Sequence, residues 1–387
     1  MPAARWVRSW VVFASIGAVA LGMTIGGGSL AGAAAPASAA SSARSVAAAD
    51  GSLGEVTTVP HSSDLWVMGQ VLAGTRSGYQ FFEARRHHGH WLRVKAPPIG
   101  ANSGTLNTVV AGSSHDVWLG GAKQLSRIRV LPAIYKWTGK NFVAAKLPKL
   151  QKQYAGDTGV NAMSASAAGN AWAVGDLDLP GGKQVALHWN GKKWSAVPLT
   201  LSFGTDGLRA VATSGPTNAW AATDGESTSL IHWNGSTWTA AGAVPSPDRI
   251  DAMAVSSPTL GYAVGYRLLP HSRYGTVILR YNGTSWDAAP IAKSVPECQV
   301  ISVSMHGRSA WAIGALNNSK GSVILHSTGG AWHVQRSTGR LNNLYAVAAG
   351  SVNRAFAVGD FYDSAFVEKT YVDYYNGHAW KAVPSGF

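Results

Sequence analysis

The sequence repeats one two-part pattern seven times, and this repeat constrains the fold more than any other feature. Each copy has an aromatic residue in a short apolar run that usually ends in Gly, followed by a turn and a second aromatic residue. The first aromatics are Trp66, Trp118, Trp172, Trp220, Tyr262, Trp311 and Phe356, and the second are Trp91, Phe142, Trp194, Trp238, Trp286, Trp332 and Trp380. Successive first aromatics lie 52, 54, 48, 42, 49 and 45 residues apart. This period predicts an all-β, seven-bladed β-propeller with four antiparallel strands per blade.

Each repeat can be divided into four expected strands. Strand one precedes the first aromatic, and its copies are residues 106–109, 160–163, 208–211, 250–253, 298–301 and 344–347, with 53–56 as a degenerate first copy. Strand two carries the first aromatic, strand three precedes the turn, and strand four begins at the second aromatic. Alternation of apolar and polar residues favours strands over helices. Asn-Gly pairs at 190–191, 234–235, 282–283 and 376–377 suit tight hairpins between strands three and four.

The N-terminal region has the pattern of an export signal. Arg5 and Arg8 precede an apolar run from 10 to 21, and small residues end at Ala37-Ser38-Ala39. We interpret residues 1–39 as a signal peptide, 40–50 as a flexible leader and 51–387 as the propeller. A retained membrane anchor is the alternative reading of the same segment. We therefore expect a secreted, extracellular protein, associated with the cell wall in one version of this prediction, and no membrane-spanning segment after cleavage.

Cys298 is the single cysteine of the chain, so an intramolecular disulfide is impossible. The sequence alignment places it at the strand-one position that Leu106, Val160 and Leu208 hold in other blades. A buried Cys behaves as a small apolar residue. We therefore predict a packing role for it.

The Gly-ended second strand and the turn before the second Trp resemble kelch-type propellers, including the central domain of galactose oxidase-like proteins. The chain is also similar to secreted bacterial propellers built from Asp-box (BNR) repeats. These resemblances cover residues 51–387 and imply the architecture. Only Gly120-Gly121 forms the Gly pair of a kelch strand, and the turn at 232–238 lacks the Asp of an Asp-box. The copper centre that the oxidase resemblance implies needs a Cys bonded to Tyr, so the packing role of Cys298 leads us to expect no cofactor.

The connections between strands differ in their regularity. Those from strand one to two and from three to four are short and nearly uniform, whereas those from strand two to three and between blades vary in length and composition. In an up-and-down blade the two irregular sets emerge on the same face of the disc. Variable loops on a rigid scaffold are typical of binding surfaces, and drift in unconstrained loops is the alternative.

The residue after the leading apolar residue of strand one is polar in most repeats. These residues are Asn107, Asn161, Arg209, Asp251, Gln299 and Tyr345. We predict that they surround the axis at the mouth of the variable face and bind a ligand there. A ring solvated by channel water is the alternative. Arg209 and Asp251 come from consecutive blades and could pair; a hydrolase would need a second carboxylate, for which Glu55 is the candidate.

Histidines offer a weak case for a metal site. His87, His88 and His90 are close in sequence, but they lie at an expected hairpin tip without a carboxylate or Cys. His188, His232 and His326 share one position on strand three, which indicates a scaffold role. We therefore expect no metal.

Charge is concentrated in the first two repeats. The chain carries a net charge of +13, and residues 76–152 hold thirteen Lys or Arg against Glu83 and Asp116. The candidate patch for an anionic partner comprises Arg85, Arg86, Arg127, Arg129, Lys136 and Lys140. The aromatic residues belong to the repeat and do not alternate with these cations, which argues against nucleic acid. A solvated basic surface without a dedicated partner is the alternative.

The sequence as a whole favours a monomeric, non-catalytic binding or scaffold propeller at the cell envelope. Its expected partner is an anionic wall polymer or glycan, or an extracellular protein. One competing hypothesis is an enzyme that acts on polysaccharide at the axis. The other is a protein-interaction scaffold, which predicts an apolar patch on the variable face.

Overall fold

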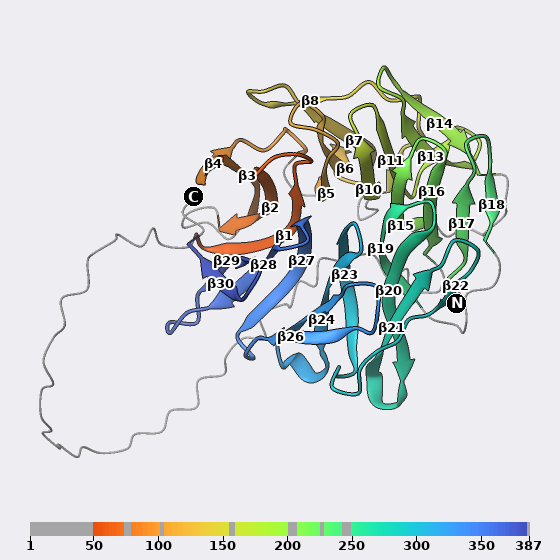
Figure 1. The fold of residues 1–387 in the computed structure, drawn as a ribbon. Coiled ribbons are helices and arrows are strands. Elements are labelled where there is room, and N and C mark those ends of the chain that lie inside the picture. Colours follow the sequence, from red (N-terminus) through yellow and green to blue (C-terminus); the bar gives the residue numbers. More distant parts are fainter. Residues whose placement is uncertain are drawn as a thin grey trace, which may run out of the picture.

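The computed structural model describes residues 49–72, 79–87, 89–100, 104–154, 159–199, 207–224, 228–241 and 249–384 of the 387-residue chain. Seven antiparallel sheets surround a central axis (Figure 1). In every sheet the four main strands follow one another in sequence order, with the first strand nearest the axis. The predicted seven-bladed propeller with four-stranded blades is confirmed. The predicted signal peptide lies outside the described residues, as does the leader apart from Ala49 and Asp50.

The strands of the first four blades have the following bounds. Blade 1 contains β1 (Gly51–Thr58), β2 (Leu65–Leu72), β3 (Tyr79–His87) and β4 (His90–Val94), and blade 2 contains β5 (Thr105–Ala111), β6 (Val117–Ser126), β7 (Arg129–Trp137) and β8 (Phe142–Ala144). Blade 3 contains β10 (Val160–Ala167), β11 (Asn170–Gly175), β13 (Lys183–Trp189) and β14 (Trp194–Pro198), and blade 4 contains β15 (Leu208–Gly215), β16 (Asn218–Thr223), β17 (Leu230–Trp233) and β18 (Trp238–Ala240). The two-residue strands β9 (Gln153–Tyr154) and β12 (Asp178–Leu179) extend blades 2 and 3.

The other three blades follow the same plan. Blade 5 contains β19 (Arg249–Ser257), β20 (Leu260–Leu269), β21 (Arg273–Tyr281) and β22 (Trp286–Ala288), and blade 6 contains β23 (Cys298–His306), β24 (Ser309–Leu316), β25 (Ser322–Ser327) and β26 (His333–Ser337). Blade 7 contains β27 (Asn342–Ser351), β28 (Arg354–Tyr362), β29 (Glu368–Tyr375) and β30 (Trp380–Val383). The helices of the described part are two single turns, η1 (Pro270–Ser272) and η2 (Asn317–Ser319). Neither they nor any other described segment forms an apolar helix of membrane-spanning length.

The hydrophobic core lies between the blades and consists of seven clusters, each shared by two neighbouring sheets. In six of them the first aromatic of one blade packs edge-on against the second aromatic of the next. These pairs are Trp66–Phe142, Trp118–Trp194, Trp172–Trp238, Trp220–Trp286, Tyr262–Trp332 and Trp311–Trp380, with ring centroids 5.0 to 5.4 Å apart. The two halves of the repeat thus meet across a blade boundary, which explains why they recur together.

The repeated histidines of strand three support this aromatic frame. His188, His232 and His326 stack on Trp172, Trp220 and Trp311, with centroids 3.9 to 4.3 Å apart. Their Nε2 atoms hydrogen-bond the side chains of Asn170, Asn218 and Ser309. Burial lowers the pKa of all three imidazoles, which favours the neutral rings. These contacts agree with the predicted scaffold role.

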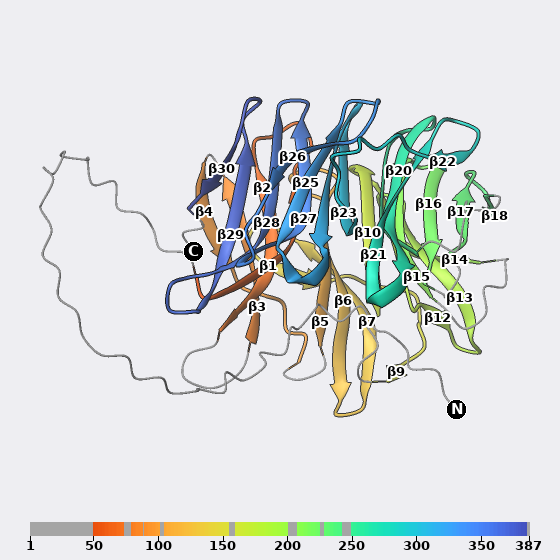
Figure 2. The same cartoon turned by 90° about the horizontal axis from the view of Figure 1, so that it is seen from below.

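The topology separates two faces of the disc. The loops from strand two to three and the links between blades emerge on one side, which we call the loop face. The hairpins from strand one to two and from three to four emerge on the other, the turn face. In Figure 2 the β6–β7 hairpin projects well beyond the other described strands on the loop face.

The ring closes by packing of blade 1 against blade 7, where β1 lies beside β27 and β28 (Figure 1). All four strands of blade 7 come from the C-terminal end of the chain. The N-terminal residues contribute one short pairing to its third strand, since the Thr370 amide donates to the carbonyl of Ala49 at 2.8 Å. Arg354 also donates to the Ser62 carbonyl at 2.7 Å. The two chain ends are therefore joined without a strand exchanged between the blades.

Candidate functional site

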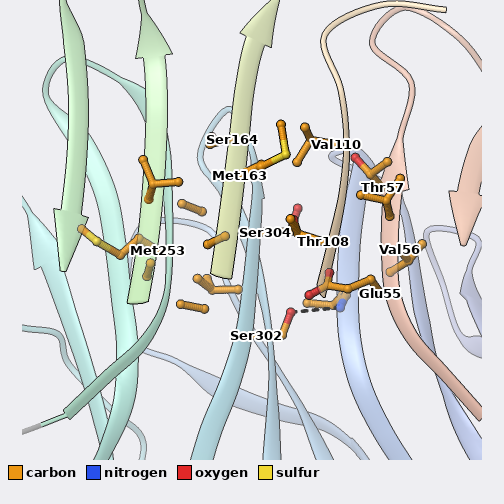
Figure 3. A pocket seen from close by; sticks show the side chains of 18 of the residues that line it. Glu55, Val56, Thr57, Thr108, Val110, Met163, Ser164, Met253, Ser302 and Ser304 are labelled. Carbon is orange, nitrogen blue, oxygen red and sulfur yellow. Dashed lines mark hydrogen bonds between the residues drawn. The ribbon is translucent and has the colours of Figure 1, made fainter. Parts of the chain in front are cut away.

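The first strands of all seven blades enclose an axial cavity of about 270 Å³. Its lining is rich in small and polar residues, including Thr108, Ser164 and Ser302, with Glu55 and Asp251 as acidic members (Figure 3). Several serines join neighbouring blades at this axis. Ser302 Oγ accepts a hydrogen bond from the Val347 amide at 3.1 Å. Small side chains let seven strand edges approach each other, and their hydroxyls satisfy exposed backbone donors.

A β-bulge marks the predicted ring position in strand one. The residues at the register shifts are Gly54, Asn107, Asn161, Arg209, Asp251, Ile301 and Tyr345. A bulge re-aims a side chain and increases the local twist. A β-bulge at this position therefore recurs in every blade, at the mouth of the cavity.

Blade 6 departs from the predicted alignment. Val300 pairs with Gly314, as Leu106 pairs with Gly121 in blade 2, so the counterpart of Leu106 is Val300 and the ring position belongs to Ile301. The alignment of Cys298 and Gln299 was therefore wrong by two residues, because it matched a polar residue after an apolar one and ignored the pairing with Gly. Cys298 is nonetheless fully buried, and burial raises the pKa of its thiol to about 11. Its packing role is unchanged.

Asn107 and Asn161 connect blades. Asn107 Nδ2 donates to the Val160 carbonyl at 2.8 Å, and Asn161 Nδ2 donates to the Leu208 carbonyl at 3.1 Å. Both side chains are buried. These two amides hold the start of the next blade in place, and their role in binding a ligand stays a prediction.

Arg209 and Asp251 form the expected pair, within a larger cluster that spans blades 4 to 6. Arg209 Nε lies 2.6 Å from Asp251 Oδ1, and its Nη1 lies 3.2 Å from Asp224 Oδ1. Asp224 also pairs with Arg249, and Gln299 Nε2 donates to Asp251 Oδ2 at 2.8 Å. We call these five residues the mouth cluster. Although Gln299 does not occupy the bulge position of its strand, its side chain still lies in the predicted group at the mouth of the cavity.

The mouth cluster is electrostatically satisfied. Burial opposes the charge of Arg209, but Asp251 and Asp224 outweigh it and raise the pKa of the guanidinium. Arg209 thus contacts both carboxylates of the cluster. The geometry therefore suits structural pairing better than hydrolysis.

Sequence reasoning missed Asp224 and Arg249. A signal was present, because an Asp recurs in three blades directly after the strand-two residue that pairs with the leading apolar residue of strand one: Asp176, Asp224 and Asp360. These positions lie beside the bulge of strand one, as the pairing of Leu208 with Thr223 shows. The recurrence of an acidic residue at one repeat position was the sequence signal for the acidic partner of Arg209.

Tyr345 belongs to a second polar group, in blade 7. It hydrogen-bonds Asp360, which also accepts a bond of 2.9 Å from Asn343 Nδ2. Asp360 is 1% exposed, and burial, with a further contribution from Glu368, raises the pKa of its carboxyl to about 6. Burial and the neighbouring Asp360 also raise the pKa of Tyr345. Here a buried acid is hydrogen-bonded and close to another acid, in contrast to the ion pairs of the mouth cluster.

The predicted anionic-partner patch does not form one surface, so that grouping is wrong. Arg85 pairs with Asp64 at 2.9 Å, and Lys136 pairs with Asp116 at 2.7 Å while its Nζ lies 5.0 Å from the Trp118 ring. Strand three runs from the loop face to the turn face, so these two cations lie toward the turn face. Arg86 and Lys140 lie at the same end of their blades. Only Arg127 and Arg129 belong to the loop face.

A different set of cations gathers on the loop face of blade 2. We call it the basic surface, and it comprises Lys95, Lys123, Arg127, Lys146, Lys149 and Lys152, all exposed. Within the described ranges no carboxylate forms an ion pair with any of them.

Two links bring these cations to the β6–β7 hairpin. The link after β4 reaches β6, where the Gln124 amide donates to the Ile99 carbonyl at 2.7 Å. The link after β8 follows the edge of β7, because Ala145 bonds Ile134 and β9 pairs with Arg129 and Val130. Charges from three segments therefore converge on one hairpin.

His87 and His90 of the clustered histidines lie on the turn face, at the end of β3 and the start of β4. His87 Nδ1 lies 2.6 Å from Asp64 Oδ2. Burial opposes ionisation of Asp64, but hydrogen bonds from Arg85 and His87 keep the pKa of its carboxyl below the ordinary value. His88 lies outside the described residues. Among those described, no three His, Cys, Asp or Glu side chains form a group that could hold a metal ion.

Comparisons with known proteins identify the architecture. No protein-family model and no curated protein sequence matches the chain. Solved structures do: a GH74 xyloglucanase from Xanthomonas campestris (13% identity, TM-score 0.60, 89% of this chain and 56% of that chain) and YCF48 from Cyanidioschyzon merolae (15%, 0.54, 85% and 96%). An ulvan lyase of polysaccharide lyase family PL25 is also similar (10%, 0.54, 87% and 97%). At these identities the likeness shows the propeller fold alone, and the resemblance to kelch-type and Asp-box repeats stays a prediction.

Proposed function

We propose that this protein is a binding propeller that holds an anionic partner on the basic surface of its loop face. The observation that carries the proposal is the convergence of six exposed cations on the β6–β7 hairpin without a carboxylate paired to them among the described residues. A group of exposed, positively charged side chains raises the local concentration of an anion and increases its association rate. The predicted export of the chain places this partner at the cell envelope, as an acidic glycan, a wall polymer or a lipid surface.

The alternative of an enzyme at the axis has less support. The axial cavity gives such an enzyme a location, and two of the similar folds are a xyloglucanase and an ulvan lyase. In this chain, however, Arg209 contacts both carboxylates of the mouth cluster. A glycosidase uses two carboxyl groups in different protonation states. The paired geometry therefore supports binding over hydrolysis.

Charge reversal tests the proposal with a matched control. The test variant combines Lys123→Glu, Lys146→Glu and Lys149→Glu on the basic surface. The control combines Lys140→Glu, Lys192→Glu and Lys193→Glu, which are exposed in turn-face hairpins and change the net charge equally. Binding to a soluble acidic polysaccharide, polygalacturonate, is measured over a series of salt concentrations.

We expect the test variant to bind at least about tenfold more weakly and with a smaller salt dependence, because fewer counterions are released. The control variant should bind like the wild type. An equal loss in both variants would assign binding to net charge alone, and unchanged binding in both would remove the basic surface from the function.

A further inference from the structure

The tip of the β6–β7 hairpin combines apolar and basic side chains. Leu125 is 46% exposed near the end of β6, and Ile128 is 66% exposed in the Arg127-Ile128 turn that follows it. Lys123 is exposed on the strand that leads to this tip. Isolated exposed apolar residues are ordinary, but two together on a projecting tip are not explained by packing within the blade.

The hairpin is held in its projecting position. β6 is bonded to the link at Ile99, and β9 pairs with the beginning of β7. Figure 2 shows that the hairpin extends past the other described strand ends and loops of the loop face. The apolar tip is therefore presented to the surroundings by a supported sheet.

Other exposed apolar side chains favour the same face. In the described part of the chain nine large apolar residues are exposed, and Leu268 (70%) and Phe366 (76%) belong, like Leu125 and Ile128, to loops between strands two and three. Leu341 lies in the link between blades 6 and 7, which also emerges on the loop face, whereas Ile291 pairs with Trp332 beside a turn-face hairpin. The loop face thus combines most of the exposed apolar residues with the basic surface.

We propose that the hairpin tip inserts Leu125 and Ile128 into an anionic lipid bilayer while the basic surface contacts the headgroups. This inference rests on the proposed function and specifies its partner. A soluble polyanion would be attracted by the cations but would gain nothing from the apolar pair. A bilayer of anionic lipid recognises both, because apolar side chains enter the boundary between headgroups and acyl chains and cations bind the charged surface. A projecting convex tip also suits insertion better than contact with a flat protein surface.

Sedimentation with lipid vesicles separates the apolar from the basic contribution. The tip variant is Leu125→Ser with Ile128→Ser, and its control is Val143→Ser with Val352→Ser, two exposed apolar residues outside the strand two-to-three loops and the links. Vesicles of phosphatidylglycerol and phosphatidylcholine are compared with phosphatidylcholine alone, and polygalacturonate binding is measured in parallel. All four side chains are substantially exposed, so unfolding temperatures should remain close to the wild-type value and serve as the folding check.

We expect the wild type to bind anionic vesicles, and the tip variant to bind them at least about tenfold more weakly, from the lost burial of two aliphatic side chains. Binding of the tip variant to polygalacturonate should remain at the wild-type level. A dye sensitive to polarity on Ser126→Cys should shift to the blue with anionic vesicles; Cys298 is buried and stays unlabelled.

The outcomes distinguish the inference from the function on which it rests. Two results would overturn the lipid inference and leave the anion-binding function. The wild type could bind polygalacturonate but not vesicles, or the tip variant could still bind vesicles. In either case the tip would face a protein. Vesicle binding that depends on the tip but not on the basic surface overturns the anion-binding function and keeps the insertion.

Discussion

The mouth cluster and the basic surface are both charged regions on the loop face, but they place their charges in opposite environments. In the mouth cluster, Arg209 and Asp251 are buried and pair between neighbouring blades at 2.6 Å, and Arg209 also pairs with Asp224 of its own blade at 3.2 Å. On the basic surface, Lys123 and Lys149 are exposed and form no ion pair with the described carboxylates. The same residue types therefore hold blades together in one region and remain available to a partner in the other.

This contrast gives a way to distinguish the residues of a repeat protein that stabilise its fold from those that bind a partner. A buried ion pair depends on its partner, because removal of one member leaves an uncompensated charge. An exposed cation has no such dependence and contributes little to folding. Substitutions in the two regions should thus affect different measurements, stability for the mouth cluster and binding for the basic surface.

The largest effect should come from the centre of the mouth cluster. Arg209→Met removes the guanidinium that two aspartates share, so we expect the free energy of unfolding to fall by about 3 to 5 kcal/mol. Chemical denaturation measures this loss. Arg127→Met is the matched change on the basic surface and should leave stability within about 0.5 kcal/mol. Equal effects of the two changes would abolish the distinction between the regions.

Asp360 gives a pH-dependent test at the same mouth. Its folded-state pKa of about 6 exceeds the ordinary value of 3.8, so the folded protein favours the protonated acid. The stabilisation associated with that proton is present at low pH and is lost as the pH rises through about 6. Asp360→Asn cannot ionise, and should therefore be more stable than the wild type at about pH 8, by up to about 3 kcal/mol, with the difference vanishing near pH 4.

Thermal unfolding across this pH range measures the effect of Asp360→Asn. Asp363→Asn is the control with the opposite sign, because hydrogen bonds from the backbone of Val367 and Ala365 lower the pKa of the Asp363 carboxyl. Its contribution is lost as the pH falls. A wild type whose stability, relative to Asp360→Asn, stays constant between about pH 4 and 8 would contradict the raised pKa.

A smaller effect is expected for the amide bonds between blades. Asn161→Ala leaves the buried carbonyl of Leu208 without its donor, which should cost about 1 to 3 kcal/mol of stability. Thermal or chemical denaturation measures this value, and vesicle or polysaccharide binding should not change. Loss of binding with intact stability would return Asn161 to the ligand-binding ring that the sequence predicted.

The fold could be predicted because its determinants recur. Paired aromatics such as Trp172 and Trp238 appear in every repeat, and their spacing alone indicates blades that stack around an axis. The position of strand one was equally accessible, apart from blade 6. There the polar Gln299 imitated the ring residue, and only the pairing of Val300 with Gly314 reveals the correct register.

The charged sites were harder to predict because their partners lie on other strands, at a face of the disc that position in the repeat does not reveal. A count of charges along the sequence does not distinguish Arg85 and Lys136 from Arg127. The direction of strand three places these two cations toward the turn face, where they pair with Asp64 and Asp116. The partners of Arg209 include Asp224, whose signal was a recurring acid after strand two. The repeat period predicts which strand position a residue occupies. Its ion-pair partners depend on which face of the disc the side chain lies toward and which side chains are next to it.

The smallest effect on stability should accompany the largest effect on binding. Lys123→Ala with Lys149→Ala removes two exposed charges, and we expect the free energy of unfolding to change by less than about 0.5 kcal/mol. Mutual repulsion among cations that lack a counter-charge also decreases, so any small change should be toward greater stability at low salt. Binding to anionic vesicles should weaken about thirtyfold, because each of the two cations near such a surface contributes about 1 kcal/mol. Denaturation and vesicle sedimentation on the same preparation provide both values. A marked loss of stability would show that these lysines belong to the scaffold, like Arg209, and would leave the loop face without a region reserved for a partner.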